Sequence, residues 1–252
     1  GRLMEKFGLS AAVVVPRVGE DRTMLLHVIG KAAANYVRET VHPEAVLGLG
    51  WGSAVYNTIC ELSNGPEVQK NVTVVPLLGG AGELDVQFQI NGFARQAARM
   101  LGGTWRALHA PCLVETSEMR RVITSHGPNA DVVGMWDHLD AALVGIGTVL
   151  SKSPMLQTPY FGNADILEME RCGAIGDVCS RFFNLRGQAC DLSINDKLVG
   201  ATLEQLKRTP MVIGVTEGPS RADTIAAAIR GGIVKTLITD EKTAQAVLES
   251  KA

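Results

Sequence analysis

The sequence predicts an α/β protein with a parallel, Rossmann-like sheet. Short apolar segments of strand length alternate along the 252 residues with longer segments of helical periodicity, which is the order typical of βαβ units. Glycines recur where the apolar segments end rather than at random. Hydrophobic residues make up 46% of the chain and charged residues 20%, so the chain can bury a substantial core.

The first half contains four expected strands and four expected helices in alternation. Residues 21–40 carry apolar side chains at helical spacing, at Leu25, Ile29, Ala33 and Val37. Ser117 is a plausible N-cap for the helix that follows the fourth strand. Strands are expected at residues 11–16, 45–50, 72–80 and 106–114, and helices at residues 21–40, 53–62, 91–103 and 117–125.

The second half keeps the same alternation. Residues 165–183 carry helical periodicity that is interrupted by Gly173 and Gly176. Proline stops the short helix that ends at position 210. Strands are expected at residues 141–147, 211–218 and 234–240, and further helices at residues 202–210, 220–232 and 241–252.

Charge and cysteine usage exclude several classes of protein. The formal net charge is −2, so no overall basic field exists to hold nucleic acid directly. No apolar run approaches the roughly 20 residues of a membrane span, and no secretory signal pattern opens the chain. The five scattered cysteines form no CxxC pair and indicate reduced thiols in a cytosol rather than a zinc site: Cys60, Cys112, Cys172, Cys179 and Cys190. Because Gly1 is not a start methionine, we expect that the chain was excised from a longer protein or processed.

Four glycine-containing turns follow expected strands. In a parallel sheet such turns lie at the carboxyl edge, where ligands bind. Glycine lets the backbone approach a ligand closely, and free N–H groups at a helix start attract anions. The alternative is a set of tight strand-to-helix turns that bind nothing. The turns span residues 48–53, 79–82, 145–148 and 216–221.

Two charged residues near these turns are candidate ligand contacts. Arg221 lies in the first turn of an expected helix that Ser220 can cap, where a cation is disfavoured unless it holds an anion such as phosphate. Asp177 follows Gly176 in an apolar context and can accept hydrogen bonds from sugar hydroxyls. A solvated surface arginine and a helix-capping aspartate are the competing interpretations.

Catalytic motifs are weak. The five histidines neighbour no serine or cysteine of a known nucleophile motif, and no HExxH pattern occurs. Glu83 and Asp85 could form an acid/base pair at a strand end, and flanking charge in a solvated loop explains them equally well.

Six segments together resemble the effector-binding domain of SorC-type bacterial transcription regulators, which sense sugars or sugar phosphates. The match runs in the family's order from about Phe7 to Leu248. The six segments are VLGLGWGSAV, PLLGGAG, INGFARQAARMLGG, LVGIGTV, GAIGDVCSRFFNLRG and ITDEKTAQAVL. The last two, in this order, are the most specific to the family.

The resemblance implies an α/β fold like that of ribose-5-phosphate isomerase and glucosamine-6-phosphate deaminase. It also implies that residues 1–252 form a single effector-binding domain, and that an N-terminal helix-turn-helix domain, absent from this chain, holds DNA. Carried over by position, Asp177 holds a ligand hydroxyl and Arg221 holds a phosphate. The expected turn contacts are Gly50, Gly52 and Ser53 in the first turn, Gly79 and Gly80 in the second, and Gly145, Ile146 and Gly147 in the floor.

The chain departs from the family's common residues at Leu78, within residues 216–218 and at Arg221. The family commonly has lysine at the position of Arg221, and Leu78 stands where some phosphate-binding members have arginine. Thr216, Glu217 and Gly218 replace the family's AGG, and a carboxylate there would repel a phosphate. The effector can therefore be an unphosphorylated sugar or polyol as well as a sugar phosphate.

The expected function is that of a cytoplasmic sugar sensor without enzymatic activity, cofactor or metal. Effector binding shifts the population of quaternary states in a homodimer or homotetramer and so alters operator affinity. The alternative is a sugar-phosphate isomerase or deaminase on the same fold. Such an enzyme calls for a lysine close behind Glu83 and Asp85, and the next lysine is Lys152.

Overall fold

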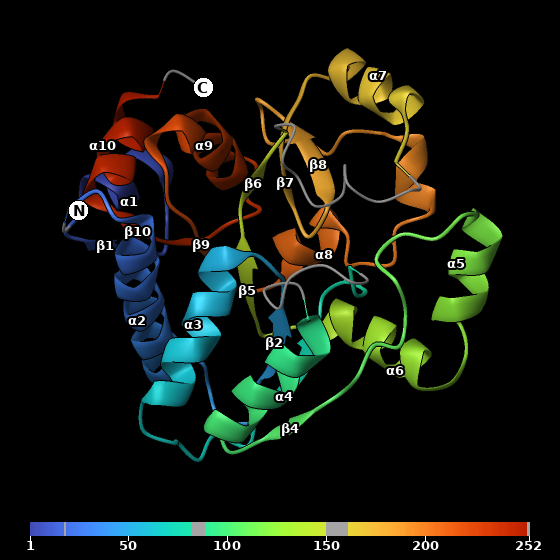
Figure 1. The fold of residues 1–252 in the computed structure, drawn as a ribbon, viewed down its shortest axis with the longest axis horizontal. Helices are drawn as coiled ribbons and strands as arrows, with labels where there is room; N and C mark the ends of the chain where they lie inside the picture. Colours follow the sequence, from blue (N-terminus) through green and yellow to red (C-terminus); the bar gives the residue numbers. More distant parts are fainter. Residues whose placement is uncertain (18, 82–88, 150–160, 251–252) are drawn as a thin grey trace.

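The core of the protein is a seven-stranded sheet in which every strand pair is parallel (Figure 1). The computed structural model describes residues 1–17, 19–81, 89–149 and 161–250. The strand order β1-β10-β9-β5-β2-β3-β4 places the first and last strands of the sequence side by side. The strands are β1 (Ala11–Val15), β2 (Val46–Leu49), β3 (Thr73–Pro76), β4 (Thr104–Trp105), β5 (Ala141–Gly145), β9 (Met211–Val215) and β10 (Thr236–Asp240). The prediction of a parallel α/β sheet is confirmed.

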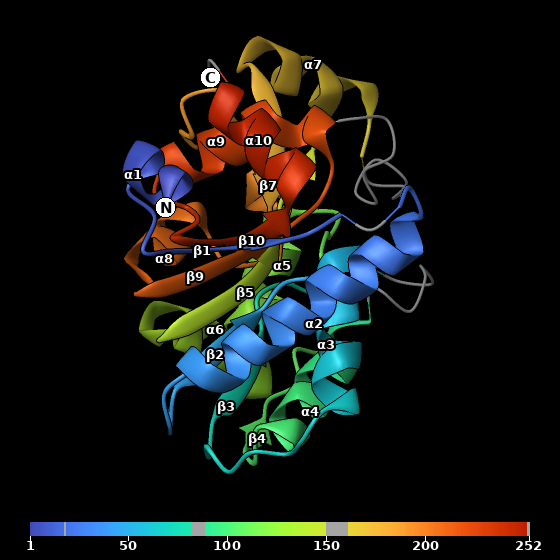
Figure 2. The same cartoon turned by 90° about the vertical axis from the view of Figure 1, so that its left-hand side faces the viewer.

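Helices cover both faces of this sheet. Alternate strand residues face opposite sides, as the two-residue period of a strand requires. Leu47 and Leu143 belong to a buried cluster with side chains of α2, α3 and α4, three helices that Figure 2 shows grouped together. Ala142 and Val212 belong to a second buried cluster, with side chains of α1, α6, α8, α9 and α10. The helices are α1 (Arg2–Phe7), α2 (Arg22–Thr40), α3 (Ser53–Asn64), α4 (Ile90–Met100), α5 (Ser117–Thr124), α6 (Gly127–Met135), α7 (Asn163–Arg171), α8 (Leu203–Arg208), α9 (Ala222–Arg230) and α10 (Glu241–Glu249). Within the described part of the chain, no helix has both the length and the apolar character needed to cross a membrane.

The helix predicted over residues 165–183 is wrong beyond its first half. Helix α7 ends before Gly173, whose φ of 67° is left-handed and stops the helix. The rest forms an antiparallel three-stranded sheet of β6 (Gly147–Thr148), β7 (Ala174–Val178) and β8 (Arg181–Asn184). β-branched and aromatic side chains in β7 and β8 favour strands, and this preference outweighs the apparent helical period.

Three smaller expectations also need correction. Residues 106–114 form only isolated bridges, in which Pro111 pairs with Gly80 and Leu113 with Leu198. Thr116, and not Ser117, caps α5 by accepting the Met119 N–H. Helix α6 was not expected, and Pro128 in its first turn is the start signal that could have indicated it.

Candidate functional site

The carboxyl ends of three neighbouring strands bring most predicted contact residues to one edge of the sheet. Strands β9, β5 and β2 are adjacent, with Gly145 paired to Val215 and Leu49 paired to Leu143. The residues that follow these strands therefore lie near one another. They are Gly50, Gly52 and Ser53 after β2, Gly145, Ile146 and Gly147 at the end of β5, and Arg221 after β9.

The β7–β8 hairpin carries Asp177 to the same edge. Gly147 in β6 lies directly opposite Asp177 in β7. A side chain at Gly147 would overlap the Asp177 carboxylate, so the glycine leaves the space that the carboxylate occupies. Two predicted residues from distant parts of the sequence thus meet in one strand pair.

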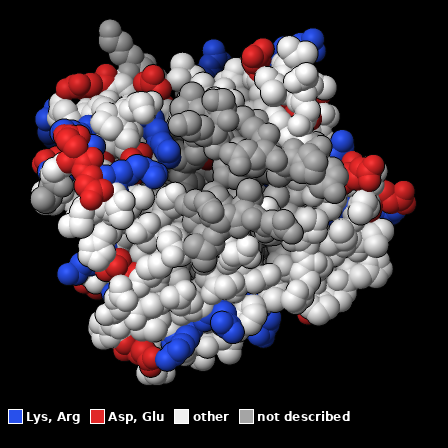
Figure 3. Space-filling model, in the orientation of Figure 1, with Lys and Arg blue, Asp and Glu red and all other residues white. Residues whose placement is uncertain are grey.

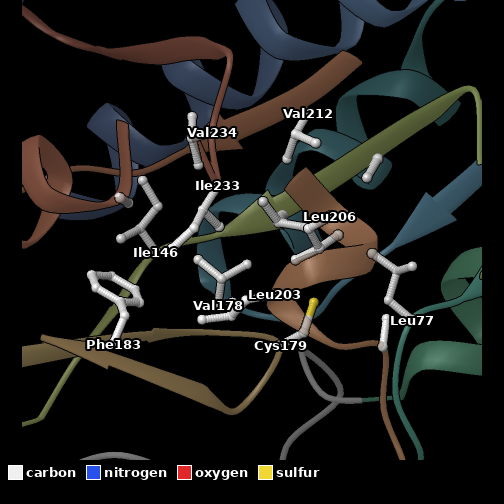
Figure 4. Close-up of a cluster of buried hydrophobic side chains, with 14 of the residues drawn as sticks. Leu77, Ile146, Val178, Cys179, Phe183, Leu203, Leu206, Val212, Ile233 and Val234 are labelled. Carbon is white, nitrogen blue, oxygen red and sulfur yellow. The ribbon is translucent and has the colours of Figure 1, made fainter. Parts of the chain in front are cut away.

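The turn of this hairpin is strained. Cys179 and Ser180 form its two central residues with φ values of 53° and 62°, in the left-handed region that non-glycine residues rarely adopt. Figure 4 shows the Cys179 sulfur pointing into the apolar cluster near Leu203 and Leu206. The Ser180 hydroxyl is buried and has no hydrogen-bond partner among the described residues. Left-handed non-glycine residues and unpaired buried hydroxyls are both uncommon in folded proteins. The sequence carries no signal for this turn, because neither central residue is glycine.

The Asp177 carboxyl is held in a poorly solvated position. Burial raises its pKa to about 6, although a hydrogen bond from the Ser180 N–H (3.1 Å) and the positive charge of Arg221 act in the opposite direction. A carboxylate with unused acceptor sites at this edge can receive hydrogen bonds from ligand hydroxyls. The expectation that Asp177 caps a helix is wrong, because it lies within a strand.

Arg221 extends across the edge toward β5. It ends the short 3₁₀ helix η5 (Pro219–Arg221) that precedes α9, and its Nη1 donates a hydrogen bond to the Ile146 carbonyl at 3.2 Å. Among the described residues, no carboxylate lies within 4.0 Å of the guanidinium. The other N–H groups of Arg221 can therefore meet an anionic or hydroxyl ligand. Ser220 makes no side-chain cap.

Glu217 does not stand as an isolated negative charge. Arg22, the first residue of α2, donates to its Oε1 at 2.9 Å. Basic and acidic side chains are similarly interspersed on the face seen in Figure 3. The repulsion of phosphate expected from Glu217 is consequently reduced, because the positive charge of Arg22 partly offsets that of the carboxylate.

Several backbone amides in the predicted cradle are already hydrogen-bonded. The N–H groups of Gly50, Gly79 and Gly80 donate to the carbonyls of Leu143, Val199 and Ala110, each at 2.9 Å. These three amides therefore have other partners, and a ligand at the turns must rely on other groups. Gly52, with a φ of 119°, opens α3, and a side chain there would meet open space. The N-terminus of α3 has the polarity that attracts a negatively polarised group.

The residues of the competing catalytic site fall outside the part of the chain that the structure describes. Glu83, Asp85 and Lys152 lie outside the described residues. Within the described ranges, no group of three or more His, Cys, Asp or Glu could hold a metal ion. Two surface pockets away from the edge contain none of the predicted contacts: about 930 Å³ between α3 and α4, and about 510 Å³ beside α6.

The raised pKa of Asp177 predicts a pH-dependent stability. The folded protein holds this proton more tightly than the unfolded chain, where the pKa is near 3.8. Its contribution is therefore fully present below pH 4 and is lost as the pH rises through about 6. Between pH 4 and 7, the free energy of unfolding of the parent should fall by at most about 3 kcal/mol more than that of Asp177→Asn.

Urea titrations across that pH range measure the difference. Asp131→Asn, on the exposed side of α6, is the control. Parallel pH profiles for parent and Asp177→Asn would contradict the prediction.

Comparison with known proteins agrees with this architecture. Residues 1–249 match the family described as "Putative sugar-binding domain". The chain is 27% identical over 249 residues to the sorbitol operon regulator of Klebsiella pneumoniae, covering 98% of this chain and 79% of the regulator. It is 31% identical over 250 residues to the transcriptional regulator LsrR of an Enterobacter species, covering 98% of this chain and 74% of LsrR.

Solved structures give the same result. The full-length sorbitol operon regulator SorC from Klebsiella pneumoniae superposes with a TM-score of 0.91 at 27% identity, covering 98% of this chain and 79% of that one. A probable sor operon regulator from Shigella flexneri gives 0.87 at 27% identity, covering 98% and 97% of the two chains. The chain therefore belongs to the sugar-binding domain family of SorC-type transcriptional regulators.

Proposed function

We propose that a carbohydrate effector binds at the carboxyl edge of the sheet, between Asp177 and Arg221. The observation that carries this proposal is their convergence: Asp177 lies opposite Gly147, and Arg221 donates to the neighbouring Ile146 carbonyl. One acceptor and one cationic donor thus flank the end of β5. Sugars, polyols and sugar phosphates offer the hydroxyl or phosphate groups that match this pair.

The glycine turns complete the proposed site. Gly52 and Ser53 present the N-terminus of α3, while Gly145 and Gly147 let the ligand approach the floor closely. Gly50, Gly79 and Gly80 act through the shape of their turns, since their amides are bonded elsewhere.

The proposed output is transcriptional. Effector binding shifts the balance between quaternary states of a homodimer or homotetramer in the cytoplasm, and so changes the operator affinity of a helix-turn-helix domain outside residues 1–252. The similarity of this chain to a sorbitol operon regulator and to the transcriptional regulator LsrR supports this role. An isomerase or deaminase of sugar phosphates is the rival function, and the family match favours the regulator.

A ligand panel tests both functions at once. Thermal unfolding and light scattering are followed with sorbitol, sorbitol 6-phosphate, ribose 5-phosphate and glucosamine 6-phosphate, and substrate turnover is assayed in the same samples. A panel member at 100 times its Kd should add about 2.7 kcal/mol, or roughly 5–10 °C in Tm, without turnover. We expect a mass above the 26.8 kDa monomer. Robust turnover would replace the regulator by the enzyme, and no thermal shift with any panel member would count against the proposed site.

A further inference from the structure

The guanidinium of Arg181 is buried and saturated by neutral acceptors. An arginine has five N–H donors, and here Nε, Nη1 and Nη2 donate to five oxygen atoms. These are the carbonyls of Asn195 (3.0 Å), Leu198 (3.3 Å), Gly200 (2.9 Å) and Ala201 (3.3 Å) and the Asn195 Oδ1 (3.4 Å). Within the described residues, no carboxylate lies within 4.0 Å of it. Burial lowers the pKa of Arg181 to about 10, which still leaves it charged at neutral pH.

A buried cation without a carboxylate partner is costly unless fixed dipoles solvate it. The carbonyls of residues 195–201 supply those dipoles, so Arg181 and this segment stabilise each other. Removing the guanidinium would leave several buried carbonyl groups without their donor.

The segment that Arg181 holds forms one wall of the second glycine turn. Gly79 donates its N–H to the Val199 carbonyl, and Ala201 donates its N–H to the Leu77 carbonyl. Leu78 and Gly200 form an antiparallel bridge between these two hydrogen bonds. The position of the turn therefore depends on the position of residues 199–201.

The backbone of Arg181 belongs to the other side of the site. Arg181 pairs with Val178 across the strained turn, one residue beyond Asp177. A single side chain therefore connects the hairpin that carries Asp177 with the wall that supports Gly79 and Gly80. The two predicted contact regions, far apart in sequence, have this direct link.

We propose that Arg181 is a positioning residue, which fixes the Gly79–Gly80 turn at a set distance from Asp177 for effector binding. The binding part of this inference rests on the proposed function, whereas the control of the turn does not. The planar fork of arginine is needed because lysine offers a point charge with three donors and cannot reach all the carbonyls at once.

The test compares Arg181→Lys with a matched control. The Arg120 Nε–H in α5 donates to the Leu198 carbonyl at 2.8 Å, the same oxygen that accepts from Arg181. Arg120→Lys therefore changes an arginine that binds the same carbonyl but does not belong to the hairpin. Amide hydrogen exchange of residues 77–80 is measured in both variants, with α2 as the internal reference. Affinity for the four panel sugars is measured by calorimetry.

We expect Arg181→Lys to speed exchange at residues 77–80 at least tenfold, with α2 unchanged. We also expect it to weaken binding of any panel sugar at least tenfold, whereas Arg120→Lys changes both readouts by less than about twofold. Unchanged exchange at residues 77–80 would overturn the proposal. Faster exchange with unchanged affinity would overturn the role in binding and leave only a structural one.

A second variant covers the case in which Arg181→Lys does not fold. Asn195→Ala removes one of the five acceptors of Arg181, the Asn195 Oδ1 that accepts from Nη1. It also removes the hydrogen bond that the Asn195 amide donates to the Cys190 carbonyl. It should speed exchange at residues 77–80 two- to threefold, and no change there would overturn the proposal. Failure of all four sugars to bind the parent would instead refute the proposed function, while the exchange readout would still decide whether Arg181 controls the turn.

Discussion

Replacing Arg221 with alanine is expected to weaken effector binding about tenfold to a hundredfold. Hydrogen bonds to a charged group contribute about 1.5–3 kcal/mol, which corresponds to that range of affinity. Arg221 donates one N–H to the Ile146 carbonyl, and its other N–H groups can donate to a ligand. Isothermal titration calorimetry with the best panel sugar measures the loss.

The control for this variant lies at the far end of α9, the helix that follows Arg221 in the sequence. Arg230 ends α9 and stacks over the Phe7 ring at 5.1 Å, so Arg230→Ala removes an arginine far from the edge and should leave affinity within about twofold. Equal affinities for the parent and Arg221→Ala would show that the ligand lies elsewhere.

Comparison with Asp177→Asn separates the ligand classes. For a sugar phosphate, Arg221→Ala has the larger effect and added salt weakens binding. For an unphosphorylated sugar or polyol, Asp177→Asn has the larger effect, because the amide replaces one acceptor oxygen by a donor, and salt matters little.

The second large effect is expected at Gly79, and it concerns stability. A Cβ atom there would overlap the Pro111 carbonyl and lie 2.6 Å from the Ala110 oxygen. Backbone cannot move aside as a flexible side chain can, so Gly79→Ala should lower the free energy of unfolding by about 3 kcal/mol or more. Urea denaturation of the ligand-free protein measures this change.

Gly80→Ala is the matched control. The nearest atom to a Cβ at Gly80 is the Ala110 oxygen at 4.0 Å, an ordinary contact, so the expected loss is below about 1 kcal/mol. Similar losses at the two positions would mean that close backbone approach is not the reason for Gly79.

The parallel sheet could be predicted because its signals are local. Apolar runs such as residues 11–15 and the helical spacing in α2 depend on neighbours in sequence, and both elements formed where expected. The carboxyl-edge location of the glycine turns then followed from the geometry of parallel strands.

The hairpin and the close contacts could not be predicted in the same way. Residues 174–184 carry apolar side chains compatible with either period, and the strand preference of their β-branched and aromatic residues is reinforced by pairing with β6 and within the hairpin. The roles of Arg181 and of the Glu217–Arg22 ion pair depend on contacts across the fold. Gly79 was taken as a ligand-lining glycine, and its close contact with Pro111 is a second reason for glycine there that sequence alone does not reveal.

The pairing of β1 with β10 affects how the chain folds during synthesis. Ala11 and Thr236 are partners in the register, so β1 has no neighbour in the sheet until almost the entire chain has left the ribosome. At about 5–20 residues per second, this delay is roughly 10–50 s. During that time the apolar AAVVV strand is exposed and can pair with other nascent chains. Slower translation lengthens the interval before β10 is available to pair with β1.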